Sequence, residues 1–247
     1  MSLYGVNGKE PIAAWIPSRD DTGNGTTTLN DLVGSNNGTL TNMDAASGWV
    51  ADTDAGGVRA LDFDGVNDFV TMGSPASLRL NSTVTVSAWV LPRSTSQLGI
   101  AVHGSGAQVY FGLVFSAASN QKLSFWNSGS AAITAPSTSA LNQWHHFVGV
   151  RSASGLELFV DGHSVATAAG STGTGIASNL MVLGQFGSFA GYKSSSRKDD
   201  IRIWDQALNA TDASDLYAAQ RGGITNPPLA QYFTGIRSYN RRRKVGT

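Results

Sequence analysis

The sequence predicts an all-β protein in which two antiparallel sheets pack face to face, followed by one short helix and an extended arm. Three observations support this prediction. Only 14% of the 247 residues are charged, against about a quarter in average globular chains, which argues against long surface helices. The chain holds 29 glycines, and short stretches that alternate apolar with polar residues recur along it. That combination is typical of many short strands joined by tight turns.

The predicted strands are the stretches in which polarity alternates with a period of two. In residues 83–88, for example, one face is apolar and the other carries hydroxyl groups, as in a strand with one side in water. Asp161 and Gly162 suit the positive φ angles that a two-residue hairpin turn requires. We expect strands within Thr83–Val90, Gln108–Phe115, Lys122–Trp126, His146–Val150, Leu156–Val160 and Ile201–Trp204.

One helix is predicted between Asn209 and Arg221. Asn209 can cap its first turn, Asp212 stands where a capping box places an acidic residue, and Gly222-Gly223 follow its end. The prolines at 227 and 228 then forbid ladder hydrogen bonds. We therefore divide the chain into an N-terminal extension (residues 1–10), a sandwich (residues 11–222) and a C-terminal arm (residues 223–247).

Charge separates the arm from the rest of the chain. Residues 1–220 carry 11 basic and 17 acidic side chains, a net charge of −6, whereas residues 221–247 carry six basic and no acidic ones. Such blocks of like charge are typical of interaction arms. We do not expect nucleic-acid binding, because the acidic body would repel DNA. The arm residues expected to contact a partner are Tyr232, Phe233, Arg237, Tyr239, Arg241, Arg242, Arg243 and Lys244.

The sequence lacks cysteine and long apolar segments, and each absence excludes certain kinds of site or location. The chain has no cysteine, which removes disulfides, thiolate metal sites and cysteine nucleophiles. No apolar run approaches the roughly 20 residues that span a bilayer, so we expect no membrane insertion. Residues 1–5 lack the basic and apolar regions of a secretory signal, so an extracellular role would need another export route or release by lysis.

Several segments stand in an order that matches a known family. They are Ala13-Ala14-Trp15, residues 36–40 (NNGTL), 60–70 (ALDFDGVNDFV), 85–90 (TVSAWV), 144–146 (WHH), 158–162 (LFVDG) and 199–204 (DDIRIW) followed by Ala207-Leu208. Over about residues 11–220 they resemble the laminin-G-like, concanavalin A-like jelly-roll superfamily, in its compact bacterial and phage form. The resemblance implies a jelly-roll sandwich. It does not specify a ligand, because this fold hosts sugar-binding, peptide-binding, catalytic and structural domains.

The resemblance also implies a cofactor, since such domains often hold one calcium ion at the sandwich rim. The candidate ligands are Asp20, Asp21, Asp31 and Asp199, which the fold could bring together. Calcium prefers six to eight oxygen ligands, and no 12-residue loop here has EF-hand spacing. The alternative is that these aspartates only stabilise loops by accepting backbone N–H groups.

Two aromatic residues beside turns are candidates for carbohydrate binding. Trp126 and Tyr192 could each stack on the apolar side of a sugar while neighbouring amides or carboxylates orient its hydroxyls. The alternative is that they only cover the edge of the core. For the motif tryptophans, Trp15, Trp89, Trp144 and Trp204, we expect a place in the core between the sheets.

A catalytic role is not predicted. Glycoside hydrolysis needs two carboxyl groups on opposite sides of the scissile bond. The only glutamates are Glu10 and Glu157, and neither has a partner acid at a suitable spacing. Asp199 and Asp200 are adjacent, so on a regular strand they would face opposite ways.

These expectations combine into one functional hypothesis and two alternatives. The chain is expected to be a non-catalytic surface module, a decoration or attachment protein of a phage or virus-like particle. Its arm would bind an acidic shell protein, its location would be the virion surface, and a cell-surface glycan would be a further ligand. The first alternative is a calcium-dependent carbohydrate-binding domain of a cell-surface or secreted system. The second is a glycoside hydrolase.

Overall fold

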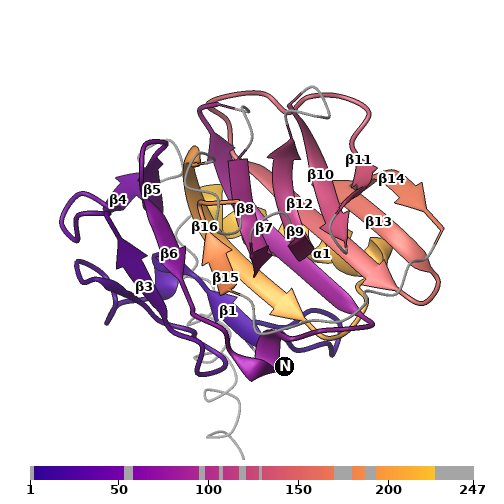
Figure 1. Cartoon of the computed structure of the whole chain (residues 1–247), viewed down its shortest axis with the longest axis horizontal. Helices are drawn as coiled ribbons and strands as arrows, with labels where there is room; N and C mark the ends of the chain where they lie inside the picture. The colour runs from indigo at the N-terminus through magenta and orange to yellow at the C-terminus, as the bar shows by residue number, and fades with distance from the viewer. Residues whose placement is uncertain are drawn as a thin grey trace, which may run out of the picture.

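The computed structural model of the chain describes residues 3–52, 58–94, 98–105, 108–116, 121–127, 130–169, 180–186 and 193–225. They form two eight-stranded antiparallel sheets that pack face to face, with one helix, α1 (Ala210–Thr225), outside them (Figure 1). The two-sheet, all-β architecture is therefore confirmed. Within this described part of the chain, no helix is long and apolar enough to cross a membrane.

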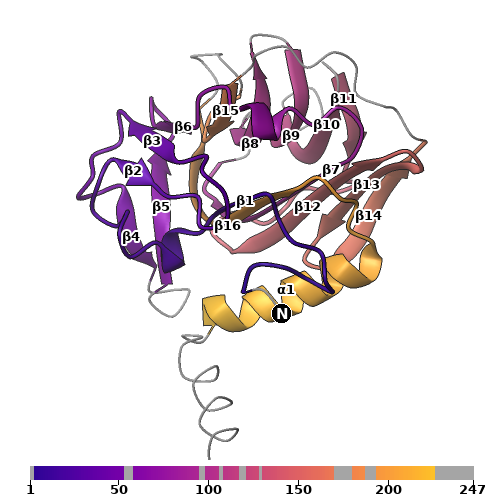
Figure 2. The ribbon, with the colours of Figure 1, turned by 90° about the horizontal axis from the view of Figure 1, so that it is seen from below.

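The helix-side sheet is the one whose outer face carries α1. Figure 2 shows α1 lying along this sheet as a third layer. The strand β1 (Ala13–Trp15) pairs with β16 beside the main path of the sheet. In spatial order that path is β14 (His163–Ala168), β13 (Gly155–Val160), β12 (His145–Ser152), β7 (Val84–Pro92), β16 (Ser195–Trp204), β5 (Val58–Asp64) and β4 (Trp49–Asp52).

The far sheet packs on the opposite face of the helix-side sheet. Its order is β11 (Ser130–Thr134), β10 (Lys122–Asn127), β9 (Gln108–Ser116), β8 (Leu98–Ser105), β15 (Leu180–Leu183), β6 (Phe69–Thr71), β3 (Gly38–Thr41) and β2 (Thr28–Leu29). Two short 3-10 helices, η1 (Pro17–Arg19) and η3 (Ala76–Leu78), lie in the connections. Each of the six strands predicted from the sequence is present, because period-two alternation matches a sheet with one apolar face.

Two of the predicted turns form as expected. Asp161 and Gly162 join β13 to β14 with φ angles of 49° and 79°, the positive values of a two-residue hairpin turn. After β5, the carboxylate of Asp64 accepts the backbone N–H groups of Val66 and Asn67. The short acidic side chain therefore stabilises the turn locally.

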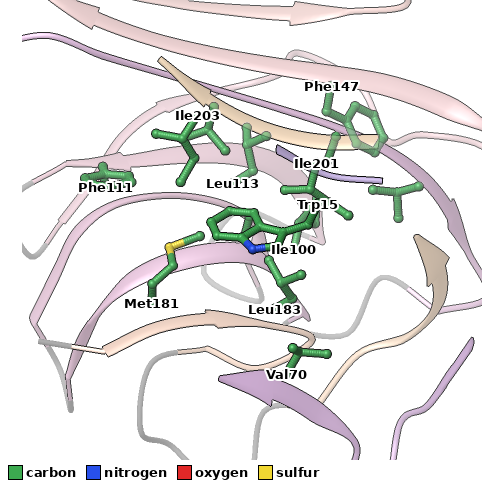
Figure 3. Close-up of a cluster of buried hydrophobic side chains, with 14 of the residues drawn as sticks. Trp15, Val70, Ile100, Phe111, Leu113, Phe147, Met181, Leu183, Ile201 and Ile203 are labelled. Atoms are coloured by element: carbon green, nitrogen blue, oxygen red, sulfur yellow. The ribbon is translucent and has the colours of Figure 1, made fainter. Parts of the chain in front are cut away.

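The core between the sheets is built around Trp15. Its ring extends from β1 into the space between the sheets and is fully buried (Figure 3). The indole N–H donates to the carbonyl oxygen of Asn36 over 2.8 Å, so the buried polar group is satisfied. Figure 3 shows the apolar side chains around it, which come from both sheets and include Ile100, Met181, Leu183, Ile201 and Ile203.

The other three motif tryptophans lie elsewhere, so their expected place between the sheets was wrong. Trp89 and Trp204 are buried on the opposite face of the helix-side sheet, in apolar clusters that α1 helps to form. Trp144 is half-buried against Trp89. Val90, next to Trp89, and Ile203, next to Trp204, face the inner core, so alternation along the strands turns these two rings outward. They are buried nonetheless, because this sheet is covered on both faces.

The helix begins as predicted and ends later than predicted. The Asn209 N–H donates to Asp212 Oδ2 and the Asp212 N–H donates to Asn209 Oδ1, both over 2.9 Å, as in a reciprocal cap. We expected Gly222-Gly223 to end the helix, but α1 continues to Thr225. Glycine lowers helix stability by only about 1 kcal/mol per residue and does not forbid helical backbone.

Residues 3–10, which the sequence suggested would form an extension, pack against the sandwich. Val6 joins the apolar cluster beneath α1, and the 6–9 segment forms a tight turn through Asn7 and Gly8. Lys9 Nζ donates to Asp212 over 2.5 Å and to the carbonyl oxygen of Ala207 over 2.8 Å. This segment and α1 therefore hold each other on the outer face of the sheet.

A buried guanidinium joins the two sheets at one end of the sandwich. Arg151, on β12, is fully buried, and its N–H groups donate to the carbonyl oxygens of Leu80, Ser82 and Tyr110 and to Asn127 Oδ1 over 2.6–3.1 Å. Burial lowers the pKa of Arg151 to about 10, so it remains charged at neutral pH. Its rigid, forked donor set satisfies acceptors from several separate segments.

We predict that Arg151→Met lowers the free energy of unfolding by about 3–5 kcal/mol, because buried acceptors would lose their donor. Urea denaturation measures this as a lower midpoint with an unchanged slope. Arg79→Met, at an exposed arginine, is the control and should change stability by less than about 1 kcal/mol. An Arg151→Met protein as stable as wild type would contradict the bridging role.

A β-bulge in β16 alters the direction of two adjacent acids. The register with β7 shifts between Asp199 and Arg202, and Asp200 has a φ of 49°. The expectation that Asp199 and Asp200 face opposite ways was therefore wrong, because the extra residue interrupts the alternation. Arg202 donates to both oxygens of Asp200. Burial, followed by the charge of Asp200, raises the pKa of Asp199 to about 7.

The pKa of Asp199 predicts an unusual pH dependence. A carboxyl group with a raised pKa in the folded state stabilises that state below the unfolded pKa, near 4, and the stabilisation is lost as pH rises through 7. Asp199→Asn is uncharged and should remove this dependence. We expect the stability difference between wild type and Asp199→Asn to fall by about 1.4 kcal/mol per pH unit between pH 5 and 7.

Urea denaturation at several pH values measures this difference. Asp21→Asn provides the matched control, because the side chain of Asp21 is 85% exposed, and its difference from wild type should be nearly constant over the same range. A constant difference for Asp199→Asn as well would mean that Asp199 is ionised throughout.

Candidate functional site

The four aspartates predicted to bind calcium are not gathered in one cluster. In the described residues, no group of three or more His, Cys, Asp or Glu side chains is close enough to hold a metal ion. Asp20 accepts the N–H groups of Gly23 and Asn30 and the amide of Asn30. Asp21 forms an ion pair with Arg59 near the surface. These contacts fit the loop-stabilising alternative.

The other two aspartates also accept hydrogen bonds from backbone N–H groups. Asp31 accepts the N–H groups of Ala14, Val33, Gly34 and Asn36, which fixes the loop after β2 against β1. Asp199 accepts the N–H of Ser18, in η1. Carboxylate oxygens that are saturated by N–H donors have little capacity left for a cation. Calcium binding therefore stays a prediction without a described group of ligands to support it.

Trp126 lies on the outer face of the far sheet, away from the inner core. It is half-buried, and its ring meets Phe186 edge to face with the centroids 5.0 Å apart. No residue in the described part of the chain accepts a hydrogen bond from its indole N–H. Beneath the two rings is an apolar patch formed by Val102, Val109, Val114 and Val182.

Strand register places Trp126 at one end of a row that crosses the far sheet. Its members face outward and pair across consecutive strands, in the order Thr28, Thr39, Thr71, Val182, Val102, Gly112 and Trp126. At about 4.8 Å per strand the row is roughly 29 Å long. Val182 and Val102, in its middle, are buried, whereas Thr39 is exposed. Hydroxyl groups therefore stand at one end and an aromatic ring at the other.

A polar group borders this face beside β6. Lys193 Nζ lies 4.3 Å from the centroid of the Phe69 ring and donates to the side-chain oxygen of Gln185. Burial lowers the pKa of Lys193, while the charges of Asp68 and Asp64 oppose this change. Lys193 is thus held between an aromatic face and an amide, at the rim of the same outer surface.

The remaining predicted site residues lie outside the described part of the chain. Tyr192 is one of them, although Phe186 and Lys193, on either side of its segment, are described. The arm residues are the others: Tyr232, Phe233, Arg237, Tyr239, Arg241, Arg242, Arg243 and Lys244.

Sequence reasoning missed Phe186, Gln185 and Lys193 as neighbours of the candidate surface. The local signal was a segment rich in glycine and aromatics around Tyr192, which could have drawn attention to Phe186. The contact between Phe186 and Trp126 joins residues 60 positions apart in the sequence. It depends on the pairing of β15 with β8 and of β9 with β10, which a local pattern does not determine.

Three of the four acidic residues considered for hydrolysis, Glu157, Asp199 and Asp200, make contacts within the protein. Glu157, on β13, accepts a hydrogen bond from Ser164 over 2.6 Å. Asp199 and Asp200 are only 3% and 5% exposed. A glycosidic bond must reach both carboxyl groups of a catalytic pair, and burial to this degree prevents such access at the Asp199–Asp200 pair.

Comparison with known proteins gives a consistent fold assignment. The structure of Trypanosoma rangeli sialidase in complex with sialic acid has a TM-score of 0.62 at 14% identity, covering 89% of this chain and 34% of that one. Domain 4 of AbnA, a GH43 extracellular arabinanase from Geobacillus stearothermophilus, in complex with arabinotriose, has a TM-score of 0.61 at 16% identity. Here 85% of this chain and 98% of that domain are covered.

A third similar structure is the binding domain of Paraclostridial Mosquitocidal Protein 1, with a TM-score of 0.62 at 15% identity, covering 85% of this chain and 52% of that one. The chain spans about a third of the length of the sialidases that it matches. No curated protein matches the sequence.

At the low sequence identities of these three structures, the structural similarities establish the fold. Residues 63–214 match the model of a family described as the concanavalin A-like lectin/glucanases superfamily, and the chain belongs to this superfamily.

Proposed function

We propose that the sandwich is a non-catalytic carbohydrate-binding module that contacts glycans through the outer face of the far sheet. The observation that carries this proposal is the position of Trp126, half-buried on that face with Phe186 beside it. An aromatic ring held on a rigid sheet offers an apolar surface for a sugar ring, while nearby hydroxyl and amide groups can orient the sugar hydroxyls. Gln185 and Lys193 are polar groups at the rim of the same outer face, and the hydroxyl group of Thr39 lies near its opposite end.

Similarity to a complete binding domain supports this proposal. Domain 4 of AbnA, whose structure holds arabinotriose, is matched over 98% of its length, whereas the sialidase chains are matched over about a third. The correspondence with a whole domain favours a module that binds its ligand by itself. The engagement of Glu157, Asp199 and Asp200 in internal contacts supports the non-catalytic part of the proposal.

We further propose that the module decorates a larger particle through its C-terminal arm, as a phage or virus-like particle protein on the virion surface. The support is the separation of charge between the body, with a net charge of −6, and the six basic side chains of residues 221–247. Arginine side chains make strong bidentate hydrogen bonds to carboxylates, which fits a shell partner with an acidic surface.

For the glycan site, we expect Trp126→Ala to weaken binding by at least about tenfold, because truncating a tryptophan anchor removes a large contact area. Linear arabinan, arabinotriose and sialyllactose are suitable first probes, followed by a glycan array. Isothermal titration calorimetry measures the affinity, and repeating it with EDTA tests whether calcium is required.

Trp144→Ala is the matched control, because Trp144 is also half-buried but directly precedes β12 and packs against Trp89 on the helix-side sheet. Its binding should equal that of wild type. A wild-type protein that binds no glycan on the array would contradict carbohydrate binding. Equal loss in the two variants would contradict the assignment to the far sheet.

For the arm, chains that end at Thr225 should fold normally and fail to join particles, since α1 and both sheets remain. Co-sedimentation with phage particles purified from the source of the protein measures incorporation. Replacing Arg241, Arg242, Arg243 and Lys244 by serine should have the same effect as truncation. Normal incorporation of the truncated chain would overturn the anchoring role.

A further inference from the structure

A histidine is stacked between α1 and the outer face of the helix-side sheet. His146, on β12, is fully buried, and its ring centroid lies 5.2 Å from that of Trp89 on β7 and 6.1 Å from that of Tyr217 on α1. Trp89 and Tyr217 are themselves stacked with centroids 5.5 Å apart. Neither ring nitrogen of His146 has a hydrogen-bond partner among the described residues. The imidazole is therefore held as an apolar ring at the helix contact.

The layer that covers this histidine has its own apolar cluster. Val148, Val150, Phe159 and Trp204 from the sheet pack there against Val6, Leu208, Ala213 and Leu216 from the N-terminal segment and the helix region. This cluster is separate from the core between the two sheets. The cover, defined here as residues 3–9 with α1, can therefore open without disrupting the inner core, as one cooperative unit of a larger fold.

We propose that the cover is released from the sandwich at acidic pH, and that protonation of His146 is the event that releases it. The proposal is independent of carbohydrate binding, because the cover and the far sheet lie on opposite sides of the molecule (Figure 2).

The charged groups around His146 come from two places. Asp200 and Arg202 belong to β16, Asp161 belongs to the turn after β13, and the two aromatic neighbours are Trp89 and Tyr217. Asp161 already accepts hydrogen bonds from His145 Nδ1 and the His146 N–H, each over 2.8 Å. Arg202 already satisfies Asp200 over 2.5 and 2.7 Å. Neither carboxylate therefore reaches the His146 ring as a hydrogen-bond partner.

This environment determines how pH changes the stability of the closed state. Burial lowers the pKa of His146 from about 6.5 to about 4; Arg202 adds to this effect, while Asp200 and Asp161 oppose it. In the closed state His146 is neutral, whereas in an open state it would regain its pKa near 6.5 in water. The closed state is fully stabilised above pH 6.5 and loses that stabilisation as pH falls toward 4. The ratio of molecules with the cover open to molecules with it closed should then rise by roughly 300-fold over the whole titration.

Two other groups with perturbed pKa values near the cover, Asp212 and Asp199, do not produce the same effect. Burial raises the pKa of Asp212, but hydrogen bonds from Lys9, the Asn209 N–H and Asn7 outweigh it and hold the pKa below the usual value. Its contact with Lys9 thus persists through this pH range. Asp199 takes up a proton near pH 7, which stabilises the folded state, and its hydrogen-bond donor is Ser18 of η1, outside the cover.

Hydrogen exchange of the full chain at pH 7 and pH 5 tests the proposal. After correction for intrinsic exchange, wild-type amides in residues 213–219 should exchange roughly twentyfold more readily at pH 5. Amides of β9 in the inner core should not change. His146→Phe keeps a ring between Trp89 and Tyr217 but cannot be protonated, so its helix amides should change less than about threefold.

His163→Phe is the matched control, because His163 is exposed on β14, two strands from β12 in the same sheet, and it should behave as wild type does. An equal increase in His146→Phe and wild type, or an equal increase in β9 and α1, would overturn the proposal. If His146→Phe does not fold, NMR titration of the wild-type His146 ring decides. A pKa well below 6 supports the proposal, and a value above 6 overturns it.

Discussion

The structure depends on one constraint: the helix-side sheet must be buried on both faces. Its inner face packs on the far sheet around Trp15, and its outer face packs on α1 and residues 3–9 around Trp204. The strands in the middle of this sheet, above all β7, β12 and β16, are therefore almost wholly removed from water. Each charged side chain that they carry must find a partner inside the protein or lose its charge.

This constraint explains the chemistry of the buried charged residues. Arg151 donates to backbone carbonyls and an amide, Arg202 pairs with Asp200, and Lys198 donates to the hydroxyl groups of Ser194 and Ser196. Burial lowers the pKa of Lys198 well below its usual value. Perturbed titration is often a sign of an active site. Four of the perturbed groups, His146, Arg151, Lys198 and Asp199, lie on the doubly covered sheet, and burial there is the main cause of each shift.

The far sheet is different, because part of its outer face remains in contact with water. There Trp126 is half-buried, Thr39 is exposed, and Lys193 lies over Phe69 at the rim. The two sheets thus have separate roles in the proposed function. One sheet would provide a rigid, buried support, and the other would present aromatic and hydroxyl groups to a ligand, which is how a site gains precision from its scaffold.

Local sequence patterns were sufficient to predict six of the strands, the Asp161-Gly162 hairpin and the reciprocal cap of α1, because alternation, turn residues and caps act over a few neighbouring positions. The family segments extended this to the sandwich architecture. The face that each ring occupies depends instead on how the layers pack. Trp89 and Trp204 face α1 because a sheet covered on both sides is apolar on both sides, and alternation no longer distinguishes inside from outside. The bulge at Asp200 and the pairing of Trp126 with Phe186 were decided in the same way. Both depend on contacts between strands that are distant in the sequence.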